Sequence, residues 1–384
     1  MTGDKKDLTF FEATAIVTGY GVGAGIMAVP YLASLSGLIP LLGLLVIGYG
    51  ISLLLHLMIV EMMMRDDETT QLVELLGKYL FRGTIGKIFL WIFFVLIAVA
   101  FVGTLTIYIV GGGEILNEII GIPLWVGEII VYLLAAAVVF FGLKVVGISE
   151  KYAILAITLV VLCLTILSLR LPTFSLDFAT VGGVKEGLAL FGMIMFSFWS
   201  FFSVPQAVEG LQWNKKLAPK AVVYGIGITF VFIVFVSLMA MGASKEVTVI
   251  AILGWTEAIG PMVKILGSIF ILLAMLTSFW SVSLALSVVL QERLGWGERL
   301  AWVIATVPSL ILAFSGLTGF LGFLRFTGGV IAILAAILMV PAYLSTKKRG
   351  VNKNPEWTMG VFGHWIFLAI VIIGYILTAV GNSV

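Results

Sequence analysis

Long apolar stretches dominate the sequence, and they recur eleven times between short polar segments. About 20 apolar residues are enough to cross the hydrocarbon core of a bilayer as an α-helix, which pairs its own backbone amides and carbonyls. Charged residues make up only 11% of the chain and apolar residues 61%. A soluble domain could not cover so much apolar surface. The sequence therefore predicts an all-α integral membrane protein that lies in a lipid bilayer.

The chain 1–384 is interpreted as a single transmembrane domain. The eleven predicted membrane-spanning helices cover residues 10–35, 38–64, 86–111, 123–143, 150–169, 187–211, 219–242, 261–290, 299–315, 319–344 and 358–381. Two connecting segments are expected to form short helices. Residues 66–81 carry apolar residues at near-helical spacing, and 247–259 are too short to span but too apolar for a free loop.

Lys and Arg in the connecting segments predict the orientation, because cytoplasmic loops carry an excess of them. With the predicted spans, seventeen Lys and Arg fall on the side of the N-terminus and four on the other, while Arg325 lies inside the tenth span. The N-terminus is therefore predicted to be cytoplasmic. Eleven crossings then place the C-terminus on the extracytoplasmic side.

Several classes of protein are disfavoured by what the sequence lacks. The net charge is only +2, and no basic cluster with interleaved aromatic residues indicates nucleic-acid binding. Cys163 is the only cysteine, which excludes an intrachain disulfide. No nucleophile–base pair, HExxH motif or phosphate-binding Gly-Lys-Ser/Thr loop is present, so we expect neither an enzyme nor a resident metal or cofactor.

Two of the spans are interrupted near their middle, and each interruption precedes a Val-Pro pair. The first span contains four glycines within residues 19–25 and then Pro30; the sixth contains the aromatic run 196–202 and then Pro205. Glycine tolerates non-helical dihedral angles, and proline cannot donate a backbone hydrogen bond. Helices 1 and 6 are therefore predicted to be broken, although close helix packing and a simple proline kink are the alternatives.

The two broken spans are five spans apart and so cross the membrane in opposite directions. This is the arrangement of an inverted repeat, with spans 1–5 (10–169) related to spans 6–10 (187–344) and an eleventh helix (358–381) added. Backbone groups freed by a break must line a cavity or bind a ligand at membrane depth. The start of a half-helix favours a carboxylate, and freed carbonyls favour a cation.

Residues 21–31, GVGAGIMAVPY, resemble the first-helix motif of the amino acid/auxin permease group. This group includes hydroxy/aromatic amino-acid permeases and sodium-coupled neutral amino-acid transporters of the amino acid–polyamine–organocation superfamily. Residues 277–286, TSFWSVSLAL, are similar to a second motif of the group, with Ser281 where glycine is usual. The resemblance implies a LeuT-type fold of 5+5 helices and a substrate site between helices 1 and 6.

The resemblance implies where an amino acid would bind. Its carboxylate is expected at the amides of Gly23, Ala24 and Gly25, and its amino group at the carbonyls of Tyr20, Gly21, Phe198 and Trp199. Thr104 shares a face of the third span with Tyr108 and is expected to line the pocket. Phe202 adds to an apolar surrounding that favours a neutral, hydrophobic or aromatic substrate.

The resemblance also implies a coupling-ion site between helices 1 and 8. Its oxygens would be the carbonyls of Gly19, Val22 and Ala274 and the hydroxyls of Thr277 and Ser278. Oxygen ligands without a full counter-charge suit a monovalent cation. In some proton-coupled relatives a lysine midway along the fifth helix takes the place of the ion. The corresponding residues here, about 156–158, include no lysine, and Lys151 lies about two turns away. Sodium is therefore favoured, and a proton is the alternative.

Intramembrane charges are functional candidates because they are costly in lipid. Arg325, two turns into the tenth span, is interpreted as an outer gate, with snorkelling to the interface as the alternative. The preferred hypothesis is a secondary active transporter of neutral amino acids that works by alternating access. A proton-coupled permease and an amino-acid sensor built on a transporter fold are alternatives, and the sequence leaves the oligomeric state open.

Overall fold

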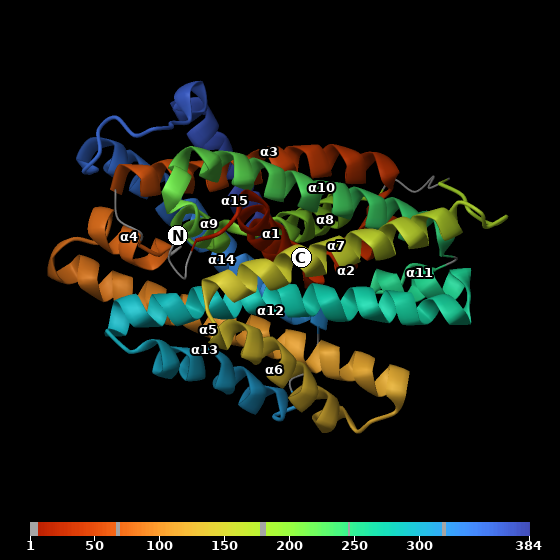
Figure 1. Ribbon diagram of the computed structural model, residues 1–384. Helices are drawn as coiled ribbons and strands as arrows, with labels where there is room; N and C mark the ends of the chain where they lie inside the picture. Colours follow the sequence, from red (N-terminus) through yellow and green to blue (C-terminus); the bar gives the residue numbers. More distant parts are fainter. Residues whose placement is uncertain (1–6, 67–69, 177–181, 245, 317–319) are drawn as a thin grey trace.

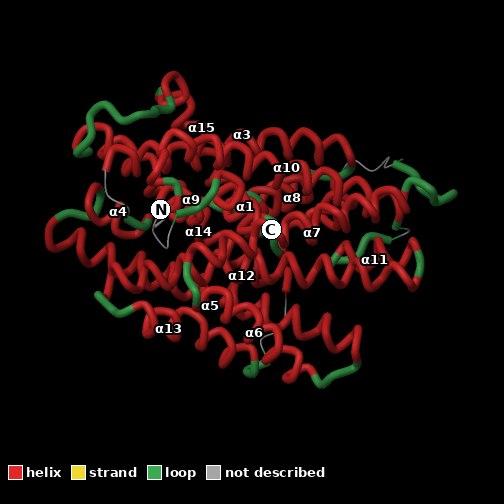
Figure 2. The backbone as a smooth tube through the Cα atoms, in the orientation of Figure 1, coloured by secondary structure: helices red, strands yellow, loops and turns green. Residues whose placement is uncertain are grey.

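The computed structural model describes residues 7–66, 70–176, 182–244, 246–316 and 320–384. Within these residues the chain forms helices joined by loops, without a β-strand (Figure 2). The predicted all-α architecture is therefore confirmed for the described part of the chain.

Fifteen α-helices make up the bundle in the described residues. They are α1 (Phe10–Gly21), α2 (Ala24–Ser36), α3 (Leu38–Asp66), α4 (Leu72–Tyr79), α5 (Gly83–Ile120), α6 (Leu124–Phe140), α7 (Leu143–Ser168), α8 (Val184–Ser197), α9 (Val204–Gly210), α10 (Ala218–Ala243), α11 (Ala251–Ile259), α12 (Lys264–Leu294), α13 (Glu298–Ala313), α14 (Phe320–Arg349) and α15 (Trp365–Ser383). Short 3₁₀ segments lie at Phe201–Ser203, Gln212–Leu217, Pro261–Val263 and Gly360–Gly363.

The helices agree with the predicted spans in position, whereas the number of crossings stays a prediction. Within the described residues, eight helices are long and apolar enough to cross a membrane, or nine when the bent pair α1 and α2 counts as one span. The remaining two predicted spans coincide with α6 and α13, which are only 17 and 16 residues long. Both expected short helices are present, as α4 and α11.

The interrupted spans occupy the middle of the bundle. The most apolar stretch of Val184–Gly210 is 89% buried inside the protein and that of Lys264–Leu294 is 83% buried, against 33–56% for the other unbent spans. The α1 helix packs against α7, α10 and α12, and α2 packs against α8 and α10. In Figure 1, α5, α6, α12 and α13 lie on one side of α1 and α2, and α3 and α10 lie on the other.

The first break lies at Val22 and Gly23, and α1 and α2 are bent by 49° there. Val22 has a ψ of 63° and Gly23 an extended conformation, so the helical pattern stops for two residues. Carbonyls that a continuous helix would pair with amides four residues later lose those partners. The structure thus confirms the interruption that the glycine run predicts.

The second break is milder. The helix α8 ends at Ser197, and α9 begins at Val204 after a short 3₁₀ turn. Phe198 and Ser200 depart from helical geometry, with ψ angles of 16° and 11°. The aromatic run therefore interrupts the helix, while the segment Val184–Gly210 still qualifies as one span.

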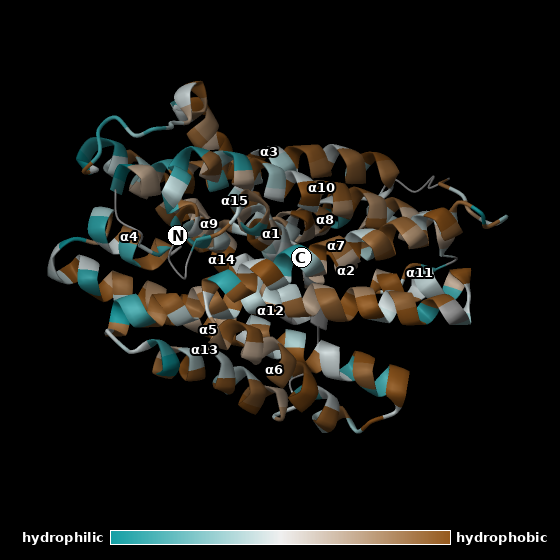
Figure 3. Ribbon diagram, viewed as in Figure 1, coloured by the Kyte–Doolittle hydropathy of each residue, from teal (hydrophilic) through white to brown (hydrophobic). Residues whose placement is uncertain are grey.

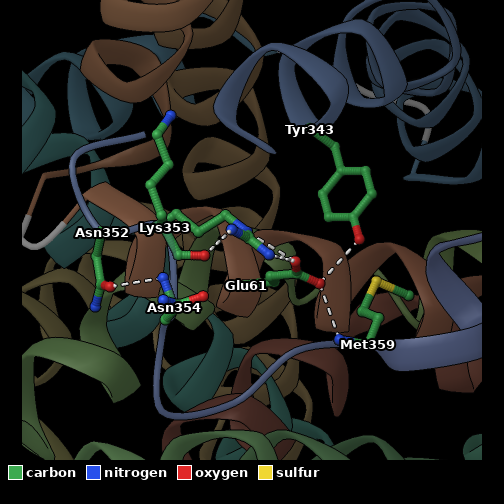
Figure 4. A network of polar contacts seen from close by, with 7 residues as sticks. Glu61, Tyr343, Asn352, Lys353, Asn354 and Met359 are labelled. Atoms are coloured by element: carbon green, nitrogen blue, oxygen red, sulfur yellow. Dashed lines mark hydrogen bonds and ion pairs between the residues drawn. The ribbon is translucent and has the colours of Figure 1, made fainter. Parts of the chain in front are cut away.

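Polar residues gather at one end of the bundle, around α4 and the N-terminus, while apolar residues cover the helix lengths (Figure 3). At this end, Glu61 of α3 holds the segment between α14 and α15 in place. Its carboxylate accepts hydrogen bonds from the Tyr343 hydroxyl and the Met359 amide, both at 2.8 Å, and pairs with Arg65 at 2.7 Å (Figure 4). Arg65 in turn donates to the Lys353 carbonyl at 3.1 Å.

Candidate functional site

The two breaks lie directly against each other at the centre of the bundle. A Cβ atom added to Gly25 would lie 2.5 Å from the Ser197 hydroxyl oxygen. One added to Gly21 would lie 3.1 Å from the Ser197 carbonyl and 3.2 Å from the Ser200 hydroxyl oxygen. Both distances to Gly21 are tighter than ordinary side-chain contacts, so the absence of a side chain lets the first break approach the second.

A pocket lies where the two breaks meet. Seven of the residues that the sequence assigns to substrate binding line it: Tyr20, Gly21, Gly23, Ala24, Gly25, Thr104 and Trp199. Phe101, Tyr108, Phe196 and Val282 complete the lining. The open space is only about 10 Å³, roughly room for one water molecule. The structure is therefore closed around the pocket, which must widen to admit an amino acid.

Phe198 and Phe202 do not line this pocket. The Phe198 carbonyl already accepts hydrogen bonds from the Ser52 hydroxyl at 3.1 Å and the Ser200 amide at 2.9 Å. The Phe202 ring packs edge-on against the Phe101 ring at 4.8 Å between centroids. In this closed arrangement Phe202 supports the pocket wall from behind, because Phe101 itself faces the pocket.

Backbone amides and orphaned polar atoms are concentrated at the breaks. The Gly23 amide donates to the Gly21 carbonyl at 2.9 Å, whereas Ala24 and Gly25 occupy the first turn of α2 and have no intrahelical acceptor. The hydroxyls of Tyr20 and Ser200 are buried without a hydrogen-bond partner among the described residues. Buried polar groups are nearly always paired, so atoms left without a partner indicate a place for water or a ligand.

Two of the expected coupling-ion ligands, Gly19 and Ser278, meet where α1 packs against α12. The Ser278 hydroxyl donates to the Gly19 carbonyl at 3.1 Å, and the Thr277 hydroxyl donates to the Ala274 carbonyl at 3.0 Å. The Val22 amide donates to the Thr18 carbonyl at 2.8 Å, at the end of α1. The structure thus joins Gly19 to Ser278 across the two helices, which the sequence could only align by resemblance.

A buried carboxyl group beside this place was missed by the sequence analysis. Glu150 of α7 is fully buried, and its carboxylate accepts a hydrogen bond from the Ser281 hydroxyl at 2.7 Å. It lies so close to Gly19 that a Cβ atom there would overlap its carboxylate. The predicted fifth span began at residue 150, whereas α7 begins at Leu143 and carries Glu150 two turns inside. The available signal was an acidic residue at the start of the predicted span, followed by Lys151 and then by apolar residues.

Two other charged residues lie away from the pocket lining. Lys151 is 3.9 Å from the Glu12 carboxylate, which also pairs with Lys144 at 2.7 Å. Arg325 is partly buried in the second turn of α14, and its Nε atom has no hydrogen-bond partner in the part of the chain that the structure describes. Neither lines the pocket. No group of three or more His, Cys, Asp or Glu residues in the described part of the chain could hold a metal ion.

The family model described as "Tryptophan/tyrosine permease family" matches residues 6–381. The chain belongs to the tryptophan/tyrosine permease family. This membership and the central pocket support a secondary transporter of aromatic amino acids rather than an enzyme. No curated protein sequence matches the chain.

Solved structures with the same fold include several transporters. MhsT, solved in complex with L-phenylalanine, has a TM-score of 0.69 and 16% identity, and the match covers 99% of both chains. Mhp1, a nucleobase-cation-symport-1 family transporter, has a TM-score of 0.67 and 15% identity over 98% of this chain and 92% of that one. An Eremococcus coleocola manganese transporter has a TM-score of 0.66 and 14% identity, over 97% and 86%. The expected LeuT-type fold is thereby supported.

Proposed function

We propose that this protein is a secondary active transporter that moves a neutral aromatic amino acid across the membrane by alternating access. The observation that carries the proposal is the closed pocket between the two helix breaks. One wall is backbone of the first break, and the other includes the aromatic side chains of Phe101, Phe196 and Trp199. The charged ends of an amino acid need the polar groups of the backbone wall, and an indole or phenol ring is stabilised by packing against the aromatic wall.

The backbone wall would hold the charged ends of the substrate. The amides of Ala24 and Gly25 begin α2, where the positive end of the helix dipole favours a carboxylate. The carbonyls of Tyr20 and Gly21, next to the break, are the proposed acceptors for the ammonium group. Each already accepts one hydrogen bond, from the Ser278 hydroxyl at 3.5 Å and from the Gly23 amide at 2.9 Å, and has a second lone pair for the substrate. The carbonyl of Trp199 is the matching acceptor on the second break.

The proposal includes the inverted repeat and the orientation of the protein in the membrane. Both breaks line one pocket, as expected if 10–169 and 187–344 are repeats that cross the membrane in opposite directions. The uneven distribution of Lys and Arg supports a cytoplasmic N-terminus and an extracytoplasmic C-terminus.

We also place the protein in the amino acid–polyamine–organocation superfamily, on the two sequence motifs. Arg325 is proposed as an outer gate, since it lies early in α14 with an unpaired Nε atom.

The driving cation has two candidates with different support. Sodium would take the carbonyls of Gly19, Val22 and Ala274 and the hydroxyls of Thr277 and Ser278, which requires the two hydroxyls to turn their protons away from the carbonyls. A proton needs a titratable group instead. The buried carboxyl of Glu150, next to Gly19, is the specific observation that favours the proton.

Reconstituted protein tests the proposed transport directly. Liposomes preloaded with unlabelled L-tryptophan should take up labelled L-tryptophan and L-tyrosine by exchange, without any ion gradient. Labelled arginine and glutamate should not exchange, because the pocket offers no side-chain charge to pair with theirs. Substrate-dependent stabilisation without exchange would instead identify an amino-acid sensor. Exchange of charged but not aromatic amino acids would refute the proposal.

A further inference from the structure

Thr104 brings a hydroxyl group into the pocket between the two breaks. It lies on α5 and is only 3% exposed. Phe101 and Tyr108, three residues before it and four after it, share its face of the helix and also line the pocket. Two further rings, those of Phe196 and Trp199, line the same pocket. A polar atom thus lies in a wall made mainly of aromatic side chains.

The Thr104 hydroxyl can accept a hydrogen bond but has no proton left to donate. It donates to the Ala100 carbonyl at 2.8 Å, one turn earlier in α5. A hydroxyl group has one proton and two lone pairs, so its oxygen can still accept. No amide or side chain of the described residues donates to that oxygen. The pocket therefore offers an acceptor that a donor on the substrate can use.

Thr104 lies beside the place of the substrate side chain rather than beside its charged ends. The Tyr108 hydroxyl oxygen marks the level of the proposed carboxylate site, because it lies 3.1 Å from a Cβ atom added to Gly23, the residue before α2. Thr104 is four residues earlier in α5, about 6 Å along the helix axis. Phe101 follows in the same direction. When the carboxylate binds at the start of α2 and the ring packs against Phe101, the ring lies beside Thr104.

We propose that the Thr104 oxygen accepts a hydrogen bond from the ring N–H of tryptophan and so makes the transporter selective for the indole side chain. The indole N–H can only donate, which matches an oxygen that can only accept. It belongs to the five-membered ring attached to Cβ, so it lies near the carboxylate end of the side chain. The tyrosine hydroxyl lies at the far end of its ring, and phenylalanine has no donor. A buried N–H group without an acceptor is costly, so Thr104 allows the pocket to close around tryptophan.

This inference rests on the proposed transport function, and one pair of ligands separates the two. The benzothiophene analogue of L-tryptophan has a similar ring shape, with a sulfur atom in place of the N–H group. Each unlabelled amino acid competes against exchange of labelled L-tryptophan in liposomes. Loss of one hydrogen bond should make the analogue about 2- to 12-fold weaker than L-tryptophan as an inhibitor of the wild type. In Thr104→Val, which keeps the shape of the side chain, the two should inhibit equally.

Two further variants separate recognition from a structural role. Thr104→Ser keeps the hydroxyl group and should keep the preference for tryptophan. Thr106→Val is the matched control, because the Thr106 hydroxyl also donates to a carbonyl one turn earlier at 2.8 Å, while Thr106 lies outside the described pocket lining. It should show the wild-type preference. A purely structural role of Thr104 would change the affinity for both ligands alike and leave their ratio unchanged.

A binding measurement keeps the test decisive if a variant does not exchange. Stabilisation of the purified protein by each ligand gives the same ratio without transport. Equal affinity of the wild type for the two ligands, or a preserved preference in Thr104→Val, would overturn the role of Thr104. Absence of tryptophan exchange in the wild type would overturn the proposed function itself.

Discussion

Replacing Gly25 with alanine tests the close approach of the two helix breaks. The added Cβ atom would lie 2.5 Å from the Ser197 hydroxyl oxygen and 3.1 Å from the Ser197 Cα atom, where 3.4–4 Å is ordinary contact. The hydroxyl can turn away only by losing its 2.9 Å hydrogen bond to the Met193 carbonyl, which contributes about 0.5–1.5 kcal/mol. The Cα atom is backbone and yields only if α2 moves away from α8.

Overpacking of this kind costs about 1–3 kcal/mol. The empty transporter can relieve it by separating α2 from α8, but this displaces the amides of Ala24 and Gly25 from the substrate carboxylate. The strain therefore weakens the binding of the substrate. At 1.4 kcal/mol per factor of ten, we expect the KM for L-tryptophan exchange to rise about 5- to 150-fold in Gly25→Ala.

The assay is the concentration dependence of labelled L-tryptophan exchange in liposomes, with protein content normalised by the amount of folded protein. Gly43→Ala is the matched control, because Gly43 lies in the second turn of α3 with no atom within 4 Å of an added Cβ. It should exchange like the wild type. A Gly25→Ala protein with wild-type KM would refute the reasoning that the two breaks together form the binding site.

Three other substitutions have expected outcomes. Tyr343→Phe removes a hydrogen bond to the Glu61 carboxylate and should lower the free energy of unfolding by about 1.5–3 kcal/mol; an unchanged unfolding midpoint in detergent would contradict this. Tyr20→Phe removes a buried hydroxyl without a partner, so the empty protein should become more stable, while stabilisation by L-tryptophan should shrink; a less stable empty protein would show that the hydroxyl is paired. Gly19→Ala would overlap the Glu150 carboxyl and should abolish exchange, which wild-type rates would disprove.

The first break was predictable because its cause is local. Four glycines between residues 19 and 25 remove the side chains that favour helical geometry, and the structure interrupts the helix at Val22 and Gly23. The short helices α4 and α11 were also predictable from local sequence, because the spacing of apolar residues and the length of the segment determine them. These elements needed no knowledge of which helices pack together.

The carboxyl at Glu150 depends on contacts between distant parts of the chain. Ser281 is 131 residues away from it, and Gly19 belongs to another helix. Glu150 stands next to Lys151 in sequence, which favours a helix end at the interface, yet Lys151 is turned toward Glu12. The sequence places an acidic residue at the start of the predicted span 150–169, but it does not show which side of the helix neighbouring helices bury.

The same reason explains the outcome for Phe198. Its place in the break was evident from the aromatic run, but its carbonyl is taken by Ser52, which is 146 residues away. A carbonyl at a break has two lone pairs, and the Phe198 carbonyl already accepts two hydrogen bonds, from the Ser52 hydroxyl and the Ser200 amide. Packing between distant helices determines which residues bond to such a carbonyl, and the local sequence does not show which helices pack together.

The central claim is that an aromatic amino acid binds by its carboxylate to the start of α2. The most direct test is an experimental structure of the protein with L-tryptophan bound. The account predicts a carboxylate oxygen within about 2.7–3.2 Å of the Ala24 and Gly25 amides, with the indole ring against Phe101 and Trp199. Density for the ligand in the cavity that Gln206 lines between α6, α9, α12 and α13, with an empty space between the two breaks, would contradict it.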